Sequence, residues 1–218
     1  MRRKKKRLKL DFNLKSLAII LILTFTATLT SFCLNRDIYE SQKNGRKEQL
    51  SELSIGDTIK GGIVFYLDAS GEHGLICSLK DQLKPSSQQA GFQWWNGKAV
   101  ETYAHGSGIG SGEKNCQEIR RWQGDCDSCN ASEICQDLSL NGYSDWYLPS
   151  KYELNLMYKN IGPGNSLGLG NAGGFDRTQY WSSTEHSKES AWCQNFSNGK
   201  QDFLSKYFEN FVRPIRRF

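Results

Sequence analysis

The sequence lacks the motifs of the common hydrolase classes. It has no serine nucleophile elbow, no His-Glu-x-x-His pair and no carboxylate pair placed by a recognisable motif. Histidine is scarce as well: His73, His105 and His186 each lie in a predicted loop, where a solvated side chain is the simplest interpretation. The sequence therefore predicts no catalytic residue, no metal and no cofactor. A hydrolase of some other design stays an unsupported alternative.

The part of the chain that follows the N-terminus also lacks a positive net charge. Residues 1–16 hold eight Lys and Arg against one Asp, a charge of +7, whereas the whole chain carries +5. The rest therefore carries about −2, and the pI of about 8.8 reflects the N-terminal segment. Because nucleic-acid-binding domains present a basic surface, we predict no nucleic-acid partner.

Residues 1–34 predict an export signal or an anchor. The segment 17–34, LAIILILTFTATLTSFCL, is apolar or small and uncharged, and it follows the basic run, an order typical of export with the basic end left in the cytoplasm. Its length lies between that of a cleaved signal peptide and that of a membrane-spanning helix. Cys33 adds lipid attachment as a third alternative, although its neighbour Phe32 is large for that processing site. All three alternatives predict an extracytoplasmic location in the cell envelope, membrane-anchored or secreted.

Residues 35–54 form a predicted polar tether, and residues 55–218 a predicted folded domain. The tether is mixed in charge and poor in aromatic residues, so it can bury little apolar surface. In the domain, two β-rich runs at 63–67 and 75–79 flank turn residues and predict a hairpin. Short aromatic segments with turns between them, over residues 179–218, predict further antiparallel strands, the last of them tied into the sheet.

Two capped helices are predicted between these groups of strands. Asn130 with Glu133, and Ser150 with Glu153, have the spacing of capping boxes, in which each residue satisfies a backbone amide of the other. Gly142 suits the left-handed turn that would end the first of these helices.

The resulting fold class is α+β, with two helices packed on a small antiparallel sheet and long glycine-rich loops. Trp146 and Leu148, in the link before the second helix, are predicted to fill the core. Residues 162–176 are too rich in glycine for a packed element. Residues 105–112, HGSGIGSG, lack the context of a phosphate-binding loop, so both segments are predicted surface loops. A further short helix fits residues 113–122.

Six stretches carry a resemblance to a known family. In chain order they are GGIVFYLD, GSGIGSG, LNGYSDWYLPSKYELNLMY, YWSSTE, AWCQNFSNGKQ and VRPIRRF. Over about residues 55–218 the chain resembles the Lcl C-terminal domain family, found in bacterial collagen-like surface proteins. The resemblance implies a C-type lectin-like fold and a recognition domain without chemistry of its own, since some members are adhesins that bind sulfated glycans. The chain departs from the family in lacking a collagen-like Gly-X-Y tract and in its cysteine-rich segment 116–135.

The cysteines other than Cys33 are even in number, as expected of disulfides in an exported chain. They are Cys77, Cys116, Cys126, Cys129, Cys135 and Cys193. Three disulfides are predicted with the connectivity open, and the analogy with lectin-like folds favours a Cys135–Cys193 pair. One alternative is a redox pair formed by Cys126 and Cys129, which stand before a predicted helix. Another is a zinc site formed by Cys116, Cys126, Cys129 and Cys135.

The late strands and their turn hold the predicted ligand-binding residues. These are Trp181, Glu185, Asn195, Asn198 and Asp202, with Trp192 beside them. Aromatic faces stack on sugar rings, and amide or carboxylate oxygens bind hydroxyl groups or Ca²⁺. The sequence motifs of calcium-dependent lectins are absent, so no calcium requirement is predicted. A basic patch for anionic glycans is a further hypothesis, with strand-edge solvation as its alternative; its residues are Lys206, Arg213, Arg216 and Arg217.

The predicted function is therefore that of an exported cell-surface recognition module. It would bind a glycan, a sulfated polymer or another polymer, with no catalysis, and contact the membrane through its N-terminal segment. Two alternatives remain at this point. One is a thiol-active or metal-binding envelope protein that uses Cys126 and Cys129, and the other is a structural surface protein without a ligand.

Overall fold

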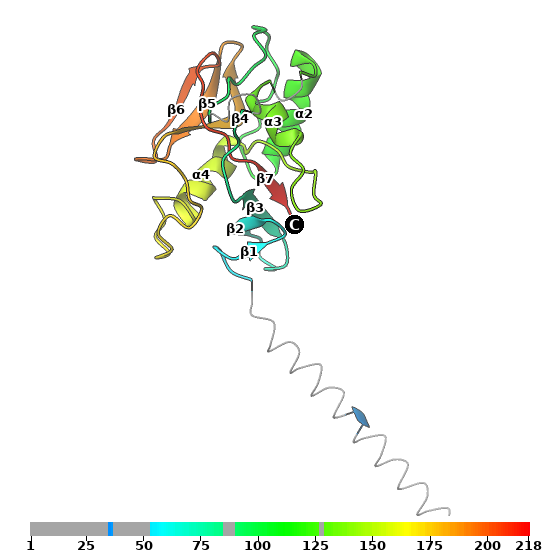
Figure 1. Ribbon diagram of the computed structural model, residues 1–218, viewed down its shortest axis with the longest axis vertical. Coiled ribbons are helices and arrows are strands. Elements are labelled where there is room, and N and C mark those ends of the chain that lie inside the picture. The colour runs from blue at the N-terminus through cyan, green and yellow to red at the C-terminus, as the bar shows by residue number, and fades with distance from the viewer. Residues whose placement is uncertain (1–34, 37–52, 85–89, 127–128) are drawn as a thin grey trace, which may run out of the picture. The chain divides into compact units, whose positions relative to one another are not determined.

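The structure is a computed structural model that describes residues 35–36, 53–84, 90–126 and 129–218 (Figure 1). Residues 53–218 belong to one compact unit. In the described part of the chain, no helix is both long enough and apolar enough to cross a membrane. The predicted export segment and its Cys33 lie outside the described residues, so the division into leader, tether and domain stays a prediction.

The first sheet contains the predicted hairpin and the C-terminal strand. Its strands are β1 (Thr58–Ile59), β2 (Gly62–Leu67), β3 (Gly74–Ser78) and β7 (Ile215–Arg217), in the order β1-β2-β3-β7. All neighbours are antiparallel, and Ile76 of β3 stands opposite Arg216 of β7. The hairpin and the C-terminal strand tied into a sheet are both confirmed.

The second sheet is the predicted antiparallel group of late strands. It consists of β4 (Gln179–Ser187), β5 (Ser190–Asn195) and β6 (Gln201–Ser205), in the order β4-β5-β6. The expectation of one small sheet is therefore wrong, because the two sheets share no strand (Figure 1). The segment after β6 runs from one sheet to the other. Phe211 forms a bridge to Tyr180 on β4, and from Ile215 onward the chain pairs with β3 in the first sheet.

The described part of the domain contains three helices where two were expected. They are α2 (Ser111–Gln123), α3 (Ala131–Gln136) and α4 (Lys151–Asn160). The helix predicted at 113–122 therefore packs into the core, where it buries Cys116 and Ile119. The α+β class is confirmed, with three helices and two antiparallel sheets.

The capping box of α4 is present in both directions. The Ser150 hydroxyl accepts a hydrogen bond from the Glu153 backbone N–H at 3.3 Å, and the Glu153 carboxylate accepts one from the Ser150 N–H at 2.8 Å. In front of this helix, Trp146 and Leu148 are buried as predicted. The local sequence thus determines where α4 begins.

The capping box predicted for α3 is only half formed. Asn130 Oδ1 accepts from the backbone N–H groups of Ser132 and Glu133, at 2.9 and 3.0 Å. The Glu133 side chain does not reach back, because it binds Arg120 on α2. The helix also ends early, with Asp137 as its C-cap, and Gly142 instead belongs to the turn between the bridged residues Leu140 and Tyr143.

The glycine-rich segment 162–176 contains no helix or strand, as predicted. Its far end is held by the Arg213 guanidinium, which donates to the carbonyl oxygens of Gly173 at 2.7 Å and Gly174 at 3.3 Å. Residues 164–168 have the Gly-x-Ser-x-Gly spacing, but they follow the C-terminus of α4 rather than a strand, so they form no nucleophile elbow.

Glu153 joins the start of α4 to the start of α2. Its buried carboxylate accepts backbone N–H groups from Gly110 at 2.7 Å and Gly112 at 3.2 Å, besides that of Ser150. A Cβ atom at Gly112 would lie 2.5 Å from Glu153 Oε2 and 2.7 Å from the Leu148 oxygen, so only glycine permits this approach. The loop before α2 is therefore fixed to α4 by one side chain.

Replacing Glu153 with Gln is expected to destabilise the domain by about 1–3 kcal/mol, because an amide group would face backbone donors and leave at least one of them unpaired. Chemical denaturation monitored by tryptophan fluorescence measures the change. Glu113→Gln, on the exposed first turn of α2, is the matched control and should shift the midpoint little. Equal midpoints for the two variants would contradict the role given to Glu153.

Burial raises the pKa of Glu153 above its ordinary value. A carboxyl group whose pKa is higher in the folded state takes up a proton on folding, so its contribution lowers stability as pH rises through the interval between the two pKa values. Glu153→Gln should lack this component of the pH dependence.

Candidate functional site

The structure does not gather the five predicted ligand-binding residues into one site. Trp181 is completely buried and donates its indole N–H to the Phe92 oxygen at 2.8 Å, so it is a core residue and its assignment to a ligand site is wrong. Asn195 and Asn198 accept hydrogen bonds from the backbone of their own turn, and Asp202 pairs with Lys200 at 2.7 Å. Of the five, Glu185 lies at a cleft, and Trp192, predicted beside them, lines the same cleft.

This cleft has a volume of about 400 Å³ and is formed by five parts of the chain. They are the loop before α2, the first turn of α4, the end of β4, and the neighbouring strands β5 and β6. Its lining residues are His105, Ser107, Lys151, Tyr152, Thr184, Glu185, Trp192 and Gln201. Most of these side chains are polar, so the cleft suits a ligand rich in hydrogen-bonding groups.

Hydrogen bonds between side chains and the backbone fix the walls of the cleft relative to one another. The Lys151 N–H donates to Thr184 Oγ1 at 2.9 Å, and Gln201 Nε2 donates to the Lys151 oxygen at 2.8 Å. The Thr184 hydroxyl in turn donates to the Gly106 oxygen at 2.8 Å. The first turn of α4 is thereby tied to β4, to β6 and to the loop before α2, and the cleft is preformed.

Lys151 and Trp192 form the central contact of the cleft. The Lys151 ammonium lies 3.1 Å from the centroid of the Trp192 ring, a cation–π contact. Lys151 makes no ion pair with a carboxylate in the described part of the chain. Partial burial lowers its pKa. The cleft therefore contains a positive charge without a carboxylate partner.

Aromatic side chains continue from both rims of the cleft, and we call them the aromatic row. They are Trp122, Tyr103 and His105 on one rim, and Trp192, His186 and Phe203 on the other. Tyr103 contacts Trp122 with ring centroids 5.1 Å apart, and His186 stacks on Phe203 at 3.8 Å. Tyr103, Trp122 and Phe203 are exposed. The row thus connects two lining residues, His105 and Trp192, to exposed rings outside the cleft lining.

Glu185 lines the cleft and binds the backbone of the loop beside it. Its buried carboxylate accepts the backbone N–H groups of Thr102 and Tyr103 at 2.9 Å and binds the Lys206 ammonium at 2.5 Å. Tyr103 has a φ of 59°, which is uncommon for an aromatic residue, and the hydrogen bond from its N–H helps to hold this conformation. Glu185 thus positions the loop that carries His105.

Glu101, His105 and Glu185 have ligand atoms within 4.8 Å of one another. Glu185 is already neutralised by Lys206, and both of its oxygens accept backbone N–H groups. A metal ion would find open ligand atoms on Glu101 and His105 only, fewer than the three protein ligands of a catalytic zinc site. The group does not fit a metal centre of that kind.

The predicted basic patch is wrong, because three of its four residues are buried in ion pairs. Lys206 binds Glu185, Arg213 binds Asp81 at 2.6 Å, and Arg216 binds Asp145 at 2.6 and 2.8 Å. Arg217 is the exposed member. These cations are held in the interior by carboxylates that lie far away in the sequence.

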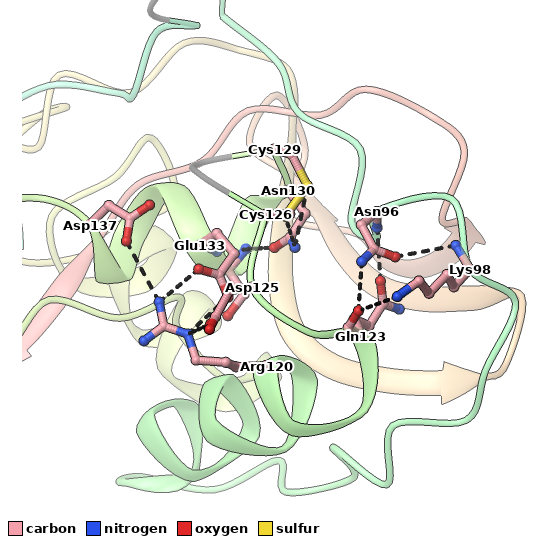
Figure 2. The surroundings of a disulfide bond; sticks show 11 residues. Asn96, Lys98, Arg120, Gln123, Asp125, Cys126, Cys129, Asn130, Glu133 and Asp137 are labelled. Atoms are coloured by element: carbon pink, nitrogen blue, oxygen red, sulfur yellow. Dashed lines mark hydrogen bonds and ion pairs between the residues drawn. A yellow bond between two sulfur atoms is a disulfide. The ribbon is translucent and has the colours of Figure 1, made fainter.

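Among the described residues there is one disulfide where three were expected, and it joins Cys126 to Cys129 (Figure 2). The other described cysteines, Cys77, Cys116, Cys135 and Cys193, are buried unpaired thiols. The predicted Cys135–Cys193 bond is therefore wrong, as is the four-cysteine zinc site, since a disulfide offers no thiolate ligands. Burial raises the pKa of Cys77 to about 11 and that of Cys116 and Cys193 to about 12.

The lining residues that the sequence did not single out include Lys151, Thr184 and Gln201. The only local signal for Lys151 was its place after the N-cap Ser150, where a side chain stands at an exposed helix start. Nothing in the sequence showed that strands 30 to 50 residues further on would lie beside it.

Comparison with known proteins identifies the family. The model of the Lcl C-terminal domain matches residues 86–216, more than half of the chain. The chain therefore belongs to the Lcl C-terminal domain family, a family of surface-associated domains. All of α2 to α4 and β4 to β6 lie in the matched region, whereas the β2–β3 hairpin precedes it. No curated protein matches the chain.

Lys206→Met is expected to destabilise the domain by about 3–5 kcal/mol, because it leaves the Glu185 carboxylate buried without its counter-ion. Thermal or chemical denaturation measures the loss. Lys200→Met is the matched control, since the Lys200–Asp202 pair is exposed and should contribute little. A Lys206 variant as stable as the control would show that the buried pair does not support the fold.

Proposed function

We propose that this domain is the recognition module of an exported cell-surface protein and binds a glycan chain or a similar polar polymer without catalysing a reaction. The observation that carries the proposal is the preformed cleft around Lys151 and Trp192, extended on both sides by the aromatic row. A compact metabolite would use the cleft alone. A polymer would also use the exposed rings beyond its rims.

The chemistry of the lining favours sugar hydroxyls. Ser107, Tyr152, Thr184 and Gln201 offer neutral donors and acceptors, and Trp192, with Lys151 over its ring, adds an aromatic group to the lining. Sugar rings present the same combination, with hydroxyl groups around the edge and C–H groups on the face.

The charge in the cleft favours an acidic ligand. Lys151 has an aromatic ring rather than a carboxylate as its partner, so a sulfate or carboxylate group of the ligand can pair with it. This single lysine replaces the multi-residue basic patch as the basis for binding an anionic polymer.

The absence of catalysis is part of the proposal. His105 is the histidine at the cleft, and in the described part of the chain no hydrogen bond joins its ring to Ser107 or Thr184. A serine or threonine nucleophile would need such a base. The proposal also places the domain outside the cytoplasm in the cell envelope, through the N-terminal segment, and assigns it a C-type lectin-like fold.

Trp192→Ala is expected to weaken polymer binding about tenfold, since an aromatic contact contributes about 1.5 kcal/mol. A glycan array identifies the ligand, and titration with the best polymer gives the Kd. Phe208→Ala, which removes an exposed ring outside the cleft lining, is the matched control and should bind like the parent protein. If the array and pull-downs with sulfated polymers are both empty, the proposal fails.

Lys151→Gln is expected to weaken binding of sulfated polymers more than binding of uncharged ones and to flatten the dependence of Kd on salt, because it removes the unpaired charge. Binding measured at two salt concentrations tests this, and EDTA should leave the affinity unchanged. Lys188→Gln, a change of an exposed lysine outside the cleft lining, serves as the control. An unaltered salt dependence in Lys151→Gln would remove the charge argument.

A further inference from the structure

The Cys126–Cys129 disulfide is the part of the described cysteine chemistry that solvent can reach. Cys129 is exposed and Cys126 is half-buried, whereas the other four described cysteines are buried. Burial also raises the pKa of each of those four thiols, so they are poor nucleophiles. Any thiol exchange on the described surface must therefore take place at this pair.

The Asn130 side chain connects the disulfide to α3 and has its orientation fixed. Its Oδ1 accepts the backbone N–H groups of Ser132 and Glu133, so the amide cannot turn over without losing the helix cap. Its Nδ2 consequently faces the sulfurs, 3.3 Å from Cys126 Sγ and 4.0 Å from Cys129 Sγ (Figure 2). The side chain is completely buried.

The Asn130 amide suits a negative sulfur better than a neutral one. A disulfide sulfur is a weak acceptor, whereas a hydrogen bond to a thiolate is charge-assisted and lowers the thiol pKa. The nearer sulfur belongs to Cys126. The protein thus holds a donor in place for the charge that develops on Cys126 when the disulfide opens.

The chain on both sides of the pair is held by contacts that do not involve sulfur. Arg120 binds Asp125, just before Cys126, at 3.1 Å and the buried Glu133 on α3 at 3.0 and 2.7 Å (Figure 2). At the end of α2, the Asn96 amide donates to the Gln123 oxygen at 2.7 Å. With these anchors in place, two reduced thiols would stay close enough to pair again.

We propose that Cys126–Cys129 is an exchange-active disulfide that accepts two electrons from a dithiol, with Asn130 as the positioning residue that stabilises the Cys126 thiolate. A thiolate of the dithiol attacks the exposed Cys129 Sγ. The S–S bond breaks, and its electron pair leaves with Cys126 Sγ, toward the Asn130 amide.

The second thiolate of the dithiol then completes the exchange. It attacks the reductant's own sulfur in the mixed disulfide, which releases Cys129 as a thiolate and closes the reductant's disulfide. The two protons that the dithiol loses end on Cys126 and Cys129. The pair is reduced, the dithiol is oxidised, and no further reactant is needed.

Asn130→Asp is the sharpest test, because it keeps the oxygen that caps α3 and replaces the donor facing Cys126 with a carboxylate oxygen. Dithiothreitol is the probe, applied to the full chain in detergent with Cys33→Ser as background. Quenching by alkylation and mass spectrometry of the peptide that contains both cysteines gives the rate. Reduction should be slower than in the parent protein, because Cys126 is the leaving group and a thiol with a higher pKa leaves more slowly. Alkylation of the reduced protein against pH should show the rise in the Cys126 pKa directly.

Asn130→Ser is the companion variant, since serine keeps a capping oxygen and removes the amide donor without adding charge. It should fall between the parent and Asn130→Asp in both rate and pKa, with unchanged tryptophan fluorescence as the check on folding. The proposal is overturned if dithiothreitol reduces the pair only after the protein is unfolded in urea. It is equally overturned if Asn130→Asp matches the parent in both the rate and the pH profile.

Discussion

The buried ion pair between Glu185 and Lys206 is the contact on which the arrangement of the cleft depends. Glu185 binds the backbone of the 102–103 segment, and Lys206 extends the contact to the end of β6. The Lys206 ammonium also lies 4.3 Å from the centroid of the buried Trp94 ring. The Lys206 carbonyl oxygen accepts a hydrogen bond from the Trp94 backbone N–H at 3.1 Å. One pair of charges thus joins a loop, two strands and a core aromatic residue. Removing either partner would leave the other charge in the interior.

The sequence was most informative where the determining contacts are local. Ser150 and Glu153 are three residues apart, and their reciprocal hydrogen bonds make the start of α4 predictable from the residue types alone. Glu133 has the same spacing from Asn130, yet its partner Arg120 lies on another helix, and a charged partner outside the local segment displaced the expected contact. The basic residues near the C-terminus failed as a predicted patch for a related reason. Arg213 and its carboxylate partner Asp81 are 132 residues apart.

The candidate site was predictable in part for the same reason. Glu185 and Trp192 stood out as an acidic and an aromatic residue on late strands. The position of Lys151 at the cleft, in contrast, depends on the packing of α4 beside β4. The cysteines show why their number alone is a weak guide to disulfides, because an even number says nothing about the distance between them. A disulfide needs Cα atoms within about 7 Å. Cys126 and Cys129 meet this requirement, with Cα atoms 5.4 Å apart, because they are only three positions apart in the sequence.

The cleft lining and the disulfide lie at opposite ends of α2, and Trp122 of the aromatic row lies near the disulfide end. The loop that carries His105 leads into the helix at Ser111, and the disulfide follows its C-terminus, so 13 residues of helix, about 20 Å, separate them. Asn115 fixes the first end by hydrogen bonds to the Gly106 oxygen at 2.6 Å and to Ser183 at 3.1 Å. A change at the disulfide could reach the cleft by displacing this helix, which Asn115 anchors at one end and Arg120 near the other, or through the contact between Trp122 and Tyr103. The proposed polymer recognition and the proposed thiol exchange therefore use the two ends of one helix, with Trp122 and Tyr103 in contact between them.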